Sequence, residues 1–142
     1  MQLGMIGLGK MGLPMAHNAR ERGIEVVVFS EKTEKIADLA TDGIRGYARL
    51  EEFIAALVTP RVVWLMIPAG PPVDAMISRL LPLLAPGDIL IDGGNSWYQD
   101  SQRRYAQLKQ SGMHFLDAGT SGGTEGARHG ACRMVGGDKA VC

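Results

Sequence analysis

Apolar positions fall into two kinds of segment that alternate along the chain. Continuous apolar runs, several of them rich in β-branched residues, occupy residues 2–6, 25–29, 61–67, 88–92 and 114–117. Runs of this kind are typical of strands that are buried on both faces of a sheet. Between them, apolar side chains recur at the spacing of amphipathic helices over residues 12–22, 33–42, 50–58, 73–84 and 97–111. The pattern therefore predicts strands and helices in alternation.

The ends of these segments carry the residues that begin and end helices. Pro14 lies in the first turn of the first helix, and Gly23 follows its last turn. Ser96, with Gln99 three residues later, predicts a capping box at the start of the helix over 97–111. Short connections between alternating strands and helices predict an α/β fold of the Rossmann type. We expect a doubly wound, mostly parallel sheet with helices on both faces and right-handed crossovers.

Length and charge limit the function classes. The chain has 142 residues, 15 basic and 15 acidic, without a linker or a repeat, so we expect one domain over residues 1–142. Scattered cations and a net charge of zero argue against a nucleic-acid partner. The absence of a long apolar run and of a signal peptide argues against a membrane partner and favours the cytoplasm. Cys132 and Cys142 lack metal-ligand spacing, so we expect no metal site, a core residue at 132 and a tail residue at 142.

Residues 7–12 read Gly-Leu-Gly-Lys-Met-Gly between the first strand and the first helix. This G-x-G-x-x-G spacing in that context is typical of dinucleotide binding. The first glycine permits a tight turn, the second lets the backbone approach a pyrophosphate, and the third lets helix and strand pack closely. The helix N-terminus adds free N–H groups for the anion. The alternative is that the glycines only shape a turn.

The end of the second strand bears on the choice of cofactor. An acidic side chain there binds the ribose hydroxyls of NAD, whereas basic residues accept the 2′-phosphate of NADP. Here the residues are Ser30, Glu31 and Lys32. Glu31 would repel a 2′-phosphate, so we favour NAD. NADP stays open, because Ser30 and Lys32 can receive the phosphate if Glu31 points away.

Two further segments carry a resemblance to a known family. Residues 92–96 read Asp-Gly-Gly-Asn-Ser, and residues 117–128 read Asp-Ala-Gly-Thr-Ser-Gly-Gly-Thr-Glu-Gly-Ala-Arg. Together with residues 7–12 they closely resemble 6-phosphogluconate dehydrogenase, and the similarity runs from the first strand to Gly137. The Ile-Pro-Ala-Gly loop at 67–70 resembles the shorter branch of the family, which often prefers NAD.

The resemblance implies an activity and a set of site residues. The activity is oxidative decarboxylation of 6-phosphogluconate to ribulose 5-phosphate and CO2, in the pentose phosphate pathway, with NAD or NADP and no metal. Asn95 would act in catalysis by contacting both nicotinamide and substrate, and the substrate would also contact Ser121, Gly122 and Gly123. The residues expected to bind the cofactor are Gly7, Leu8, Gly9, Lys10, Met11, Gly12, Ser30, Glu31, Lys32, Ile67, Pro68, Ala69, Val73 and Asn95.

Several of these residues have a purely structural alternative. Asn95 is also a common turn residue, and Gly122 with Gly123 also suits a plain bend. We interpret Glu125 and Arg128 as a structural or rim pair. The three histidines do not cluster in the sequence, and we assign none of them to catalysis or to a metal. Trp64 and Trp97 are interpreted as packing residues, with the alternative that Trp97, beside Asn95, borders the pocket.

The resemblance also implies that parts of the enzyme lie outside this chain. The family's general-base lysine, its general-acid glutamate and most of its phosphate-binding residues belong to a helical C-terminal domain, which also supplies most of the homo-oligomer interface. We therefore interpret the chain as a truncated dinucleotide-binding domain that binds cofactor without turnover, and we leave its own oligomeric state open. Two other functions remain: another β-hydroxy acid dehydrogenase, similar to 3-hydroxyisobutyrate dehydrogenase, and a noncatalytic dinucleotide-sensing module.

Overall fold

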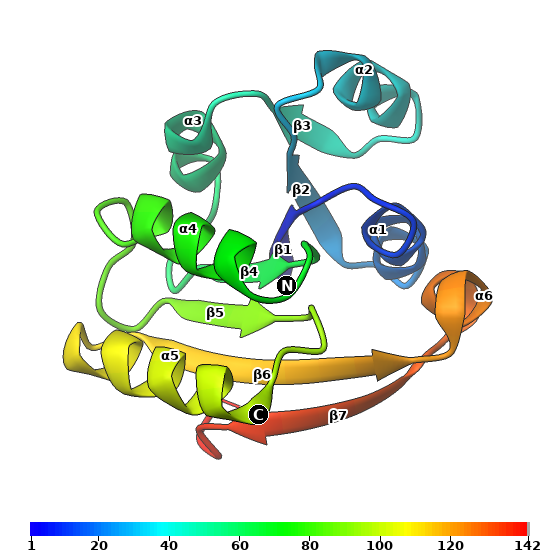
Figure 1. Ribbon diagram of the computed structural model, residues 1–142. Helices are drawn as coiled ribbons and strands as arrows, with labels where there is room; N and C mark the ends of the chain where they lie inside the picture. Colours follow the sequence, from blue (N-terminus) through cyan, green and yellow to red (C-terminus); the bar gives the residue numbers. More distant parts are fainter. Residues whose placement is uncertain (142) are drawn as a thin grey trace.

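Seven strands form one sheet in a computed structural model that describes residues 1–141 (Figure 1). Their order is β3-β2-β1-β4-β5-β6-β7. The first six are parallel to their neighbours, and β7 pairs antiparallel with β6. The strands are β1 (Gln2–Ile6), β2 (Glu25–Phe29), β3 (Arg45–Tyr47), β4 (Val62–Leu65), β5 (Ile89–Asp92), β6 (His114–Ser121) and β7 (Cys132–Gly137). The predicted mostly parallel sheet is confirmed.

Six helices cover the two faces of this sheet (Figure 1). They are α1 (Gly12–Glu21), α2 (Thr33–Thr41), α3 (Leu50–Ala55), α4 (Pro71–Leu80), α5 (Tyr98–Gln110) and α6 (Gly123–His129). One apolar cluster joins the sheet to α3, α4 and α5, and a second joins it to α1, α2 and α6. The predicted Rossmann-type arrangement, with helices on both faces, is therefore confirmed.

The central strands are buried on both sides. In β2, Val27 and Phe29 belong to the cluster under α3, α4 and α5, whereas Val26 and Val28 belong to the cluster under α1 and α2. All four side chains are at most 4% exposed. Successive side chains of a strand point to opposite faces of the sheet. A strand covered by helices on both faces therefore has apolar residues at consecutive positions.

The strand order reverses between β1 and β4, and this reversal sets where ligands can enter. From β1 the chain winds outward to β2 and β3, then returns to β4 and winds the other way to β5 and β6. The loops that follow β1 and β4 therefore diverge to opposite faces of the sheet. Open α/β sheets gather ligands in the crevice left at such a point, beyond the carboxyl ends of the strands.

The structure adds elements that the apolar pattern does not reveal. β3 is an edge strand of three residues with the sequence Arg-Gly-Tyr, so it has no apolar run to mark it. β6 extends to Ser121, four residues beyond the predicted end at 117. The glycine-rich segment 119–130 supplies the end of β6 and the short helix α6. The apolar residues within 131–135 overlap the first part of β7, and all six residues of this edge strand are exposed.

Four predictions about single residues are wrong. No capping box forms, because α5 begins at Tyr98 and the Ser96 hydroxyl donates to Asp92 Oδ2 at 2.6 Å instead. Trp97 is 60% exposed and is not a packing residue, unlike Trp64, which is buried. Cys132 lies exposed on β7, while Cys142 lies outside the described residues. Arg128 donates to Glu21 of α1, and Glu125 instead faces His129.

No helix within residues 1–141 has both the length and the apolar character needed to cross a bilayer.

A buried carboxylate ties two strands together at the amino end of the sheet. Asp88, 2% exposed, precedes β5 and accepts hydrogen bonds from the backbone N–H of Arg61 (2.7 Å) and of Ala85 (2.9 Å). The Arg61 guanidinium donates a third, at 2.9 Å. Burial alone would raise the pKa of Asp88, but these three donors outweigh it and hold the pKa below its usual value.

We expect Asp88→Asn to lower the free energy of unfolding at neutral pH by about 2 kcal/mol, because an amide cannot accept from all three donors. Because the pKa of Asp88 is lower in the folded state, its ionised carboxylate stabilises the fold at pH values above the unfolded-state pKa of about 4. This stabilisation is lost as the pH falls through the folded-state pKa of Asp88. The difference between wild type and variant should therefore shrink in acid. Urea unfolding at several pH values measures this, with the exposed Asp38→Asn as control; equal stability of Asp88→Asn and wild type at neutral pH would contradict it.

Candidate functional site

Two of the three glycines in the loop after β1 are required by the fold itself. Gly7 has φ 101°, and a Cβ there would lie 2.3 Å from the carbonyl oxygen of Met66. At Gly12 a Cβ would lie 1.9 Å from the carbonyl oxygen of Gly7. The loop after β1 thus packs backbone against backbone with the loop after β4 and with the start of α1. Any side chain at either position would force these segments apart.

Gly9 is different, because nothing in the protein requires a glycine there. Its φ is not positive, and a Cβ would meet no atom within 4 Å. Its open side borders two hollows on the surface. Beside it, α1 begins without a side-chain cap and without an acidic residue in its first turn, so the positive end of the helix is left for an anion. The loop therefore has the free space and the charge that a pyrophosphate needs.

The first hollow has a volume of about 320 Å³ and contains the end of β2. Arg79 of α4 lies across from Glu31 and donates to its Oε1 at 3.0 Å. Lys35 of α2 donates to the carbonyl oxygen of Leu8 at 2.7 Å. The predicted cofactor residues that line this hollow are Gly7, Leu8, Gly9, Ser30, Glu31, Lys32 and Ile67. Glu31 thus has one cationic partner, Arg79, which no local sequence motif marks.

The second hollow, of about 310 Å³, lies between the loops that follow β1, β4 and β5. It is lined by Gly9, Lys10, Met11, Met66, Ile67, Pro68, Gly93, Gly94, Asn95 and Thr120. The linings of the two hollows share Gly9 and Ile67, and we refer to the two hollows together as the trough. The trough runs from Glu31 at one end, past Gly9, to Asn95 at the other. It lies at the carboxyl edge of the sheet where the strand order reverses.

Asn95 links the loop after β5 to the end of β6. Its backbone has φ 52°, a left-handed conformation that asparagine tolerates better than most residues. Its Oδ1 accepts from the backbone N–H of Thr120 at 2.9 Å, and its Nδ2 donates to the carbonyl oxygen of Thr120 at 3.2 Å. One hydrogen on Nδ2 and one lone pair on Oδ1 remain for other groups. Asn95 also borders a third hollow, of about 380 Å³, toward Asp117 and β7.

Some of the expected site residues lie away from the trough. Val73 is fully buried in the core beneath α4, and Ala69 is exposed outside the lining. Ser121 ends β6 and is exposed. Gly122 and Gly123 have φ values of 129° and 59°, so they form the bend that starts α6. Ser121, Gly122 and Gly123 directly follow Thr120, whose backbone is hydrogen-bonded to the Asn95 side chain.

Beneath the Asn95 end of the trough lies a buried ionic cluster that the sequence motifs do not reveal. Arg104 of α5 and Asp92 of β5 have fully buried side chains and form an ion pair at 3.1 Å. Arg104 also donates to both carboxylate oxygens of Asp74 on α4. These bonds hold the pKa of Asp74 below its usual value. Burial works against the charge of Arg104, but its bonds to Asp74 and the charge of Asp92 outweigh it and raise the pKa of Arg104.

The spacing of α5 contains the one sequence indication of this cluster. Ser101, Arg104 and Leu108 are its buried residues, three and four positions apart. A charged residue at a position that helical periodicity turns inward must find buried partners. This argument would have singled out Arg104, but not the identity of its partners.

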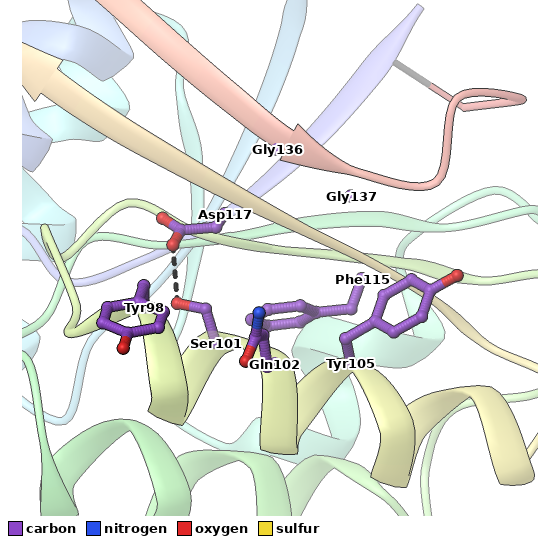
Figure 2. A pocket seen from close by; sticks show the side chains of 8 residues that line it. All are labelled: Tyr98, Ser101, Gln102, Tyr105, Phe115, Asp117, Gly136 and Gly137. Carbon is purple, nitrogen blue, oxygen red and sulfur yellow. Dashed lines mark hydrogen bonds between the residues drawn. The ribbon is translucent and has the colours of Figure 1, made fainter.

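A separate hollow of about 370 Å³ lies between α5 and the β6–β7 edge, on the far side of α5 from this cluster. Figure 2 shows Tyr105 and Phe115 along it, with the Ser101 hydroxyl directed at Asp117. That hydroxyl donates to Asp117 Oδ2 at 2.5 Å. The Ser101 hydroxyl and the Asp117 carboxylate in this hollow are thus paired with each other, and three of the other lining residues are the aromatic residues Tyr98, Tyr105 and Phe115.

Across residues 1–141, no three His, Cys, Asp or Glu side chains gather in a way that could hold a metal ion.

Comparison with known proteins assigns the chain to a family. A family model for the NAD binding domain of 6-phosphogluconate dehydrogenase matches residues 2–142. YqeC of Bacillus subtilis is 49% identical over 97% of this chain, which covers 46% of YqeC. Two further B. subtilis relatives are 6-phosphogluconate dehydrogenases, one NADP(+)-dependent (44% identical over 97% of this chain) and one NAD(+)-dependent (43% over 98%). The chain covers 30% and 31% of their lengths.

Solved structures agree with this assignment. One similar structure is a Plasmodium falciparum 6-phosphogluconate dehydrogenase, studied with NADP+ and with 6-phosphogluconate. The match covers 98% of this chain and 31% of the Plasmodium chain, at 39% identity and a TM-score of 0.90. A second is a Mycobacterium tuberculosis 3-hydroxyisobutyrate dehydrogenase. The match covers 98% of this chain and 47% of the mycobacterial chain, at 30% identity and a TM-score of 0.87. The chain thus spans less than half the length of these relatives. It belongs to the family of the NAD-binding domain of 6-phosphogluconate dehydrogenase.

Proposed function

We propose that this chain is the dinucleotide-binding part of an enzyme that oxidises and decarboxylates 6-phosphogluconate to ribulose 5-phosphate and CO2, with NAD as the preferred cofactor. The observation that carries the proposal is Gly9. It is a glycine that the fold does not require, and it lines both the hollow that contains Glu31 and the hollow that contains Asn95. A backbone left bare at this place suits close approach of a pyrophosphate.

Each part of the trough has a defined task in this proposal. The start of α1 and the backbone around Gly9 hold the pyrophosphate. The Glu31 carboxylate accepts hydrogen bonds from the hydroxyls of the adenosine ribose, and Arg79 keeps that carboxylate oriented at 3.0 Å. At the other end, the spare donor and acceptor of Asn95 orient the nicotinamide amide and the substrate hydroxyl. When bound, the nicotinamide supplies the hydride acceptor.

The substrate end is proposed at the third hollow, which shares Asn95 with the trough. The bonds of Asn95 to Thr120 fix the residue that directly precedes the Ser121–Gly122–Gly123 segment. Consecutive residues with positive φ, such as Gly122 and Gly123, can turn successive backbone N–H groups toward an anion. We therefore propose that this segment receives the carboxylate end of the sugar acid.

Similarity favours 6-phosphogluconate over a smaller β-hydroxy acid. The Plasmodium 6-phosphogluconate dehydrogenase is 39% identical to this chain, compared with 30% for the mycobacterial 3-hydroxyisobutyrate dehydrogenase. The two have almost the same TM-score, so the fold alone does not separate them. A dinucleotide sensor without catalysis is the third possibility, and a turnover assay of the longer protein distinguishes it from the two enzymes.

We expect Gly9→Ala to weaken NAD binding by about tenfold or more, since the new methyl group would occupy the space of the pyrophosphate. Thermal stability should be unchanged or slightly higher, because the φ of Gly9 suits alanine and nothing lies within reach of the methyl. Calorimetric titration and thermal unfolding measure both. Gly136→Ala is the matched control, an equally open glycine on β7; unchanged NAD affinity in Gly9→Ala would contradict the proposal.

Glu31→Gln should shift the preference from NAD toward NADP. The substitution removes the charge that repels a 2′-phosphate, and it releases Arg79, which donates to Glu31 at 3.0 Å, to bind that phosphate. We expect the ratio of the two dissociation constants to change by about tenfold, equivalent to one favourable charge contact. Titration of each variant with NAD and with NADP measures the ratio. Glu34→Gln, on the exposed first turn of α2, is the control, and an unchanged ratio in Glu31→Gln would show that Glu31 does not face the ribose.

The 142-residue chain itself should bind NAD yet form no NADH from 6-phosphogluconate. Oxidation of a hydroxyl requires a positioned base. Lys10 is the one lysine that lines the Asn95 end of the trough within residues 1–141, and it lies in the glycine loop and not in a motif that matches the family's base. An absorbance assay with purified chain, NAD and 6-phosphogluconate tests this expectation, and measurable NADH above the protein-free blank would overturn it.

A further inference from the structure

Arg104 is the most completely satisfied charged side chain of the cluster beneath the trough. Its Nε donates to Asp74, its Nη1 donates to Asp92 (3.1 Å) and Ser96 (3.0 Å), and its Nη2 donates to Asp74 and to the carbonyl oxygen of Gly70 (3.1 Å). A guanidinium has five N–H groups. All five are therefore used, in a side chain with no exposed surface.

These bonds connect the two loops that form the Asn95 end of the trough. Gly70 ends the loop after β4 and has φ 90°, so it fixes the turn into α4. Asp92 and Ser96 flank the loop after β5 that carries Asn95. The two loops also touch directly, because a Cβ on Gly94 would lie 2.9 Å from the carbonyl oxygen of Ile67. Arg104 thus holds both loops from below through one rigid group.

The loop after β5 depends on this support for its conformation. Asp92 Oδ1 accepts from the backbone N–H of Gly94 at 3.0 Å, and Asp92 Oδ2 accepts from the Ser96 hydroxyl at 2.6 Å and from Arg104. Both ends of the short segment 94–96 are therefore bonded to one carboxylate. Between them, Asn95 adopts φ 52°, a conformation that persists only when its surroundings enforce it.

A buried ion pair of this kind contributes little net stability, because the cost of desolvation offsets most of the attraction. Its effect is geometric, and arginine suits it because the planar fork of donors fixes several acceptors at once. We propose that Arg104 is a positioning residue, which sets the Asn95 loop and the Gly70 turn so that the nicotinamide end of the trough is formed before ligand arrives. The inference rests on the proposed function for its ligand, but the loop geometry is measurable without one.

The test compares Arg104→Lys with Arg103→Lys. Arg103 is the adjacent arginine on α5 and also donates to Asp74, but it reaches neither Asp92, Ser96 nor Gly70. Each variant is titrated with NAD and with ADP-ribose, which lacks only the nicotinamide. For Arg104→Lys we expect NAD affinity to fall about tenfold, the effect of one charge-assisted hydrogen bond, with ADP-ribose affinity unchanged. Arg103→Lys should change neither. Equal weakening of both ligands, or no weakening in a folded Arg104→Lys chain, would overturn the proposal.

Amide NMR spectra of the unliganded chain provide the second measurement. The backbone amides of Gly93 and Gly94 and the side-chain amide of Asn95 should shift in Arg104→Lys and stay in place in Arg103→Lys. Should wild type bind neither ligand, the proposed function fails, and these spectra alone decide on Arg104. Unshifted loop resonances in Arg104→Lys would refute the positioning role.

A milder variant covers the case in which Arg104→Lys does not fold. Ser96→Ala removes the hydroxyl that joins Asp92 to Arg104 and leaves both charges paired. The same pattern is expected with a smaller amplitude: weaker NAD binding, unchanged ADP-ribose binding and shifted loop resonances. A Ser96→Ala chain identical to wild type in all three would count against the proposal.

Discussion

A parallel sheet covered by helices on both faces leaves one kind of place for chemistry, the edge at which its strands end. Here both faces of the central strands are filled by apolar side chains, so no polar group can reach a ligand through the layers. The loops at the carboxyl edge therefore carry the candidate site, and the reversal of strand order between β1 and β4 separates two of them enough to leave a trough. The position of the site follows from the burial of the sheet.

The sequence predicts the elements that satisfy a strong local rule. Strand β2 shows as a continuous apolar run because both of its faces are buried, and the loop after β1 shows because its glycines permit backbone contacts that no other residue allows. Elements without such a rule are missed. Edge strand β3 has neither burial nor an apolar run, and α6 is hidden within a glycine-rich stretch that suits turns equally well.

The same distinction separates the site residues that the sequence predicts from those that it misses. Residues in motifs, such as Gly9, Glu31 and Asn95, lie along the trough. The partners of Arg79 and Arg104 escape sequence reasoning because they are distant in the chain: Glu31 lies 48 residues from Arg79, and Gly70 lies 34 residues from Arg104. The failed capping box at Ser96 has the same cause. The local rule predicts that the hydroxyl oxygen accepts from a backbone N–H, but this oxygen accepts from the Arg104 guanidinium and donates its hydrogen to the buried Asp92 carboxylate.

The antiparallel strand at the end of the sheet has a consequence for how such a chain behaves at high concentration. All six residues of β7 are exposed, including Met134 and Val135, and β6 is its one strand neighbour within residues 1–141. Its outer side presents backbone N–H and C=O groups without strand partners, next to apolar side chains. Such an edge is a template for pairing with another extended chain. Arg133 is the charged residue of β7, and its guanidinium lies over the ring of Trp64 on β4 rather than at this edge. Within the described residues, the strand edge open to such pairing is therefore β7, at the opposite end of the sheet from β3.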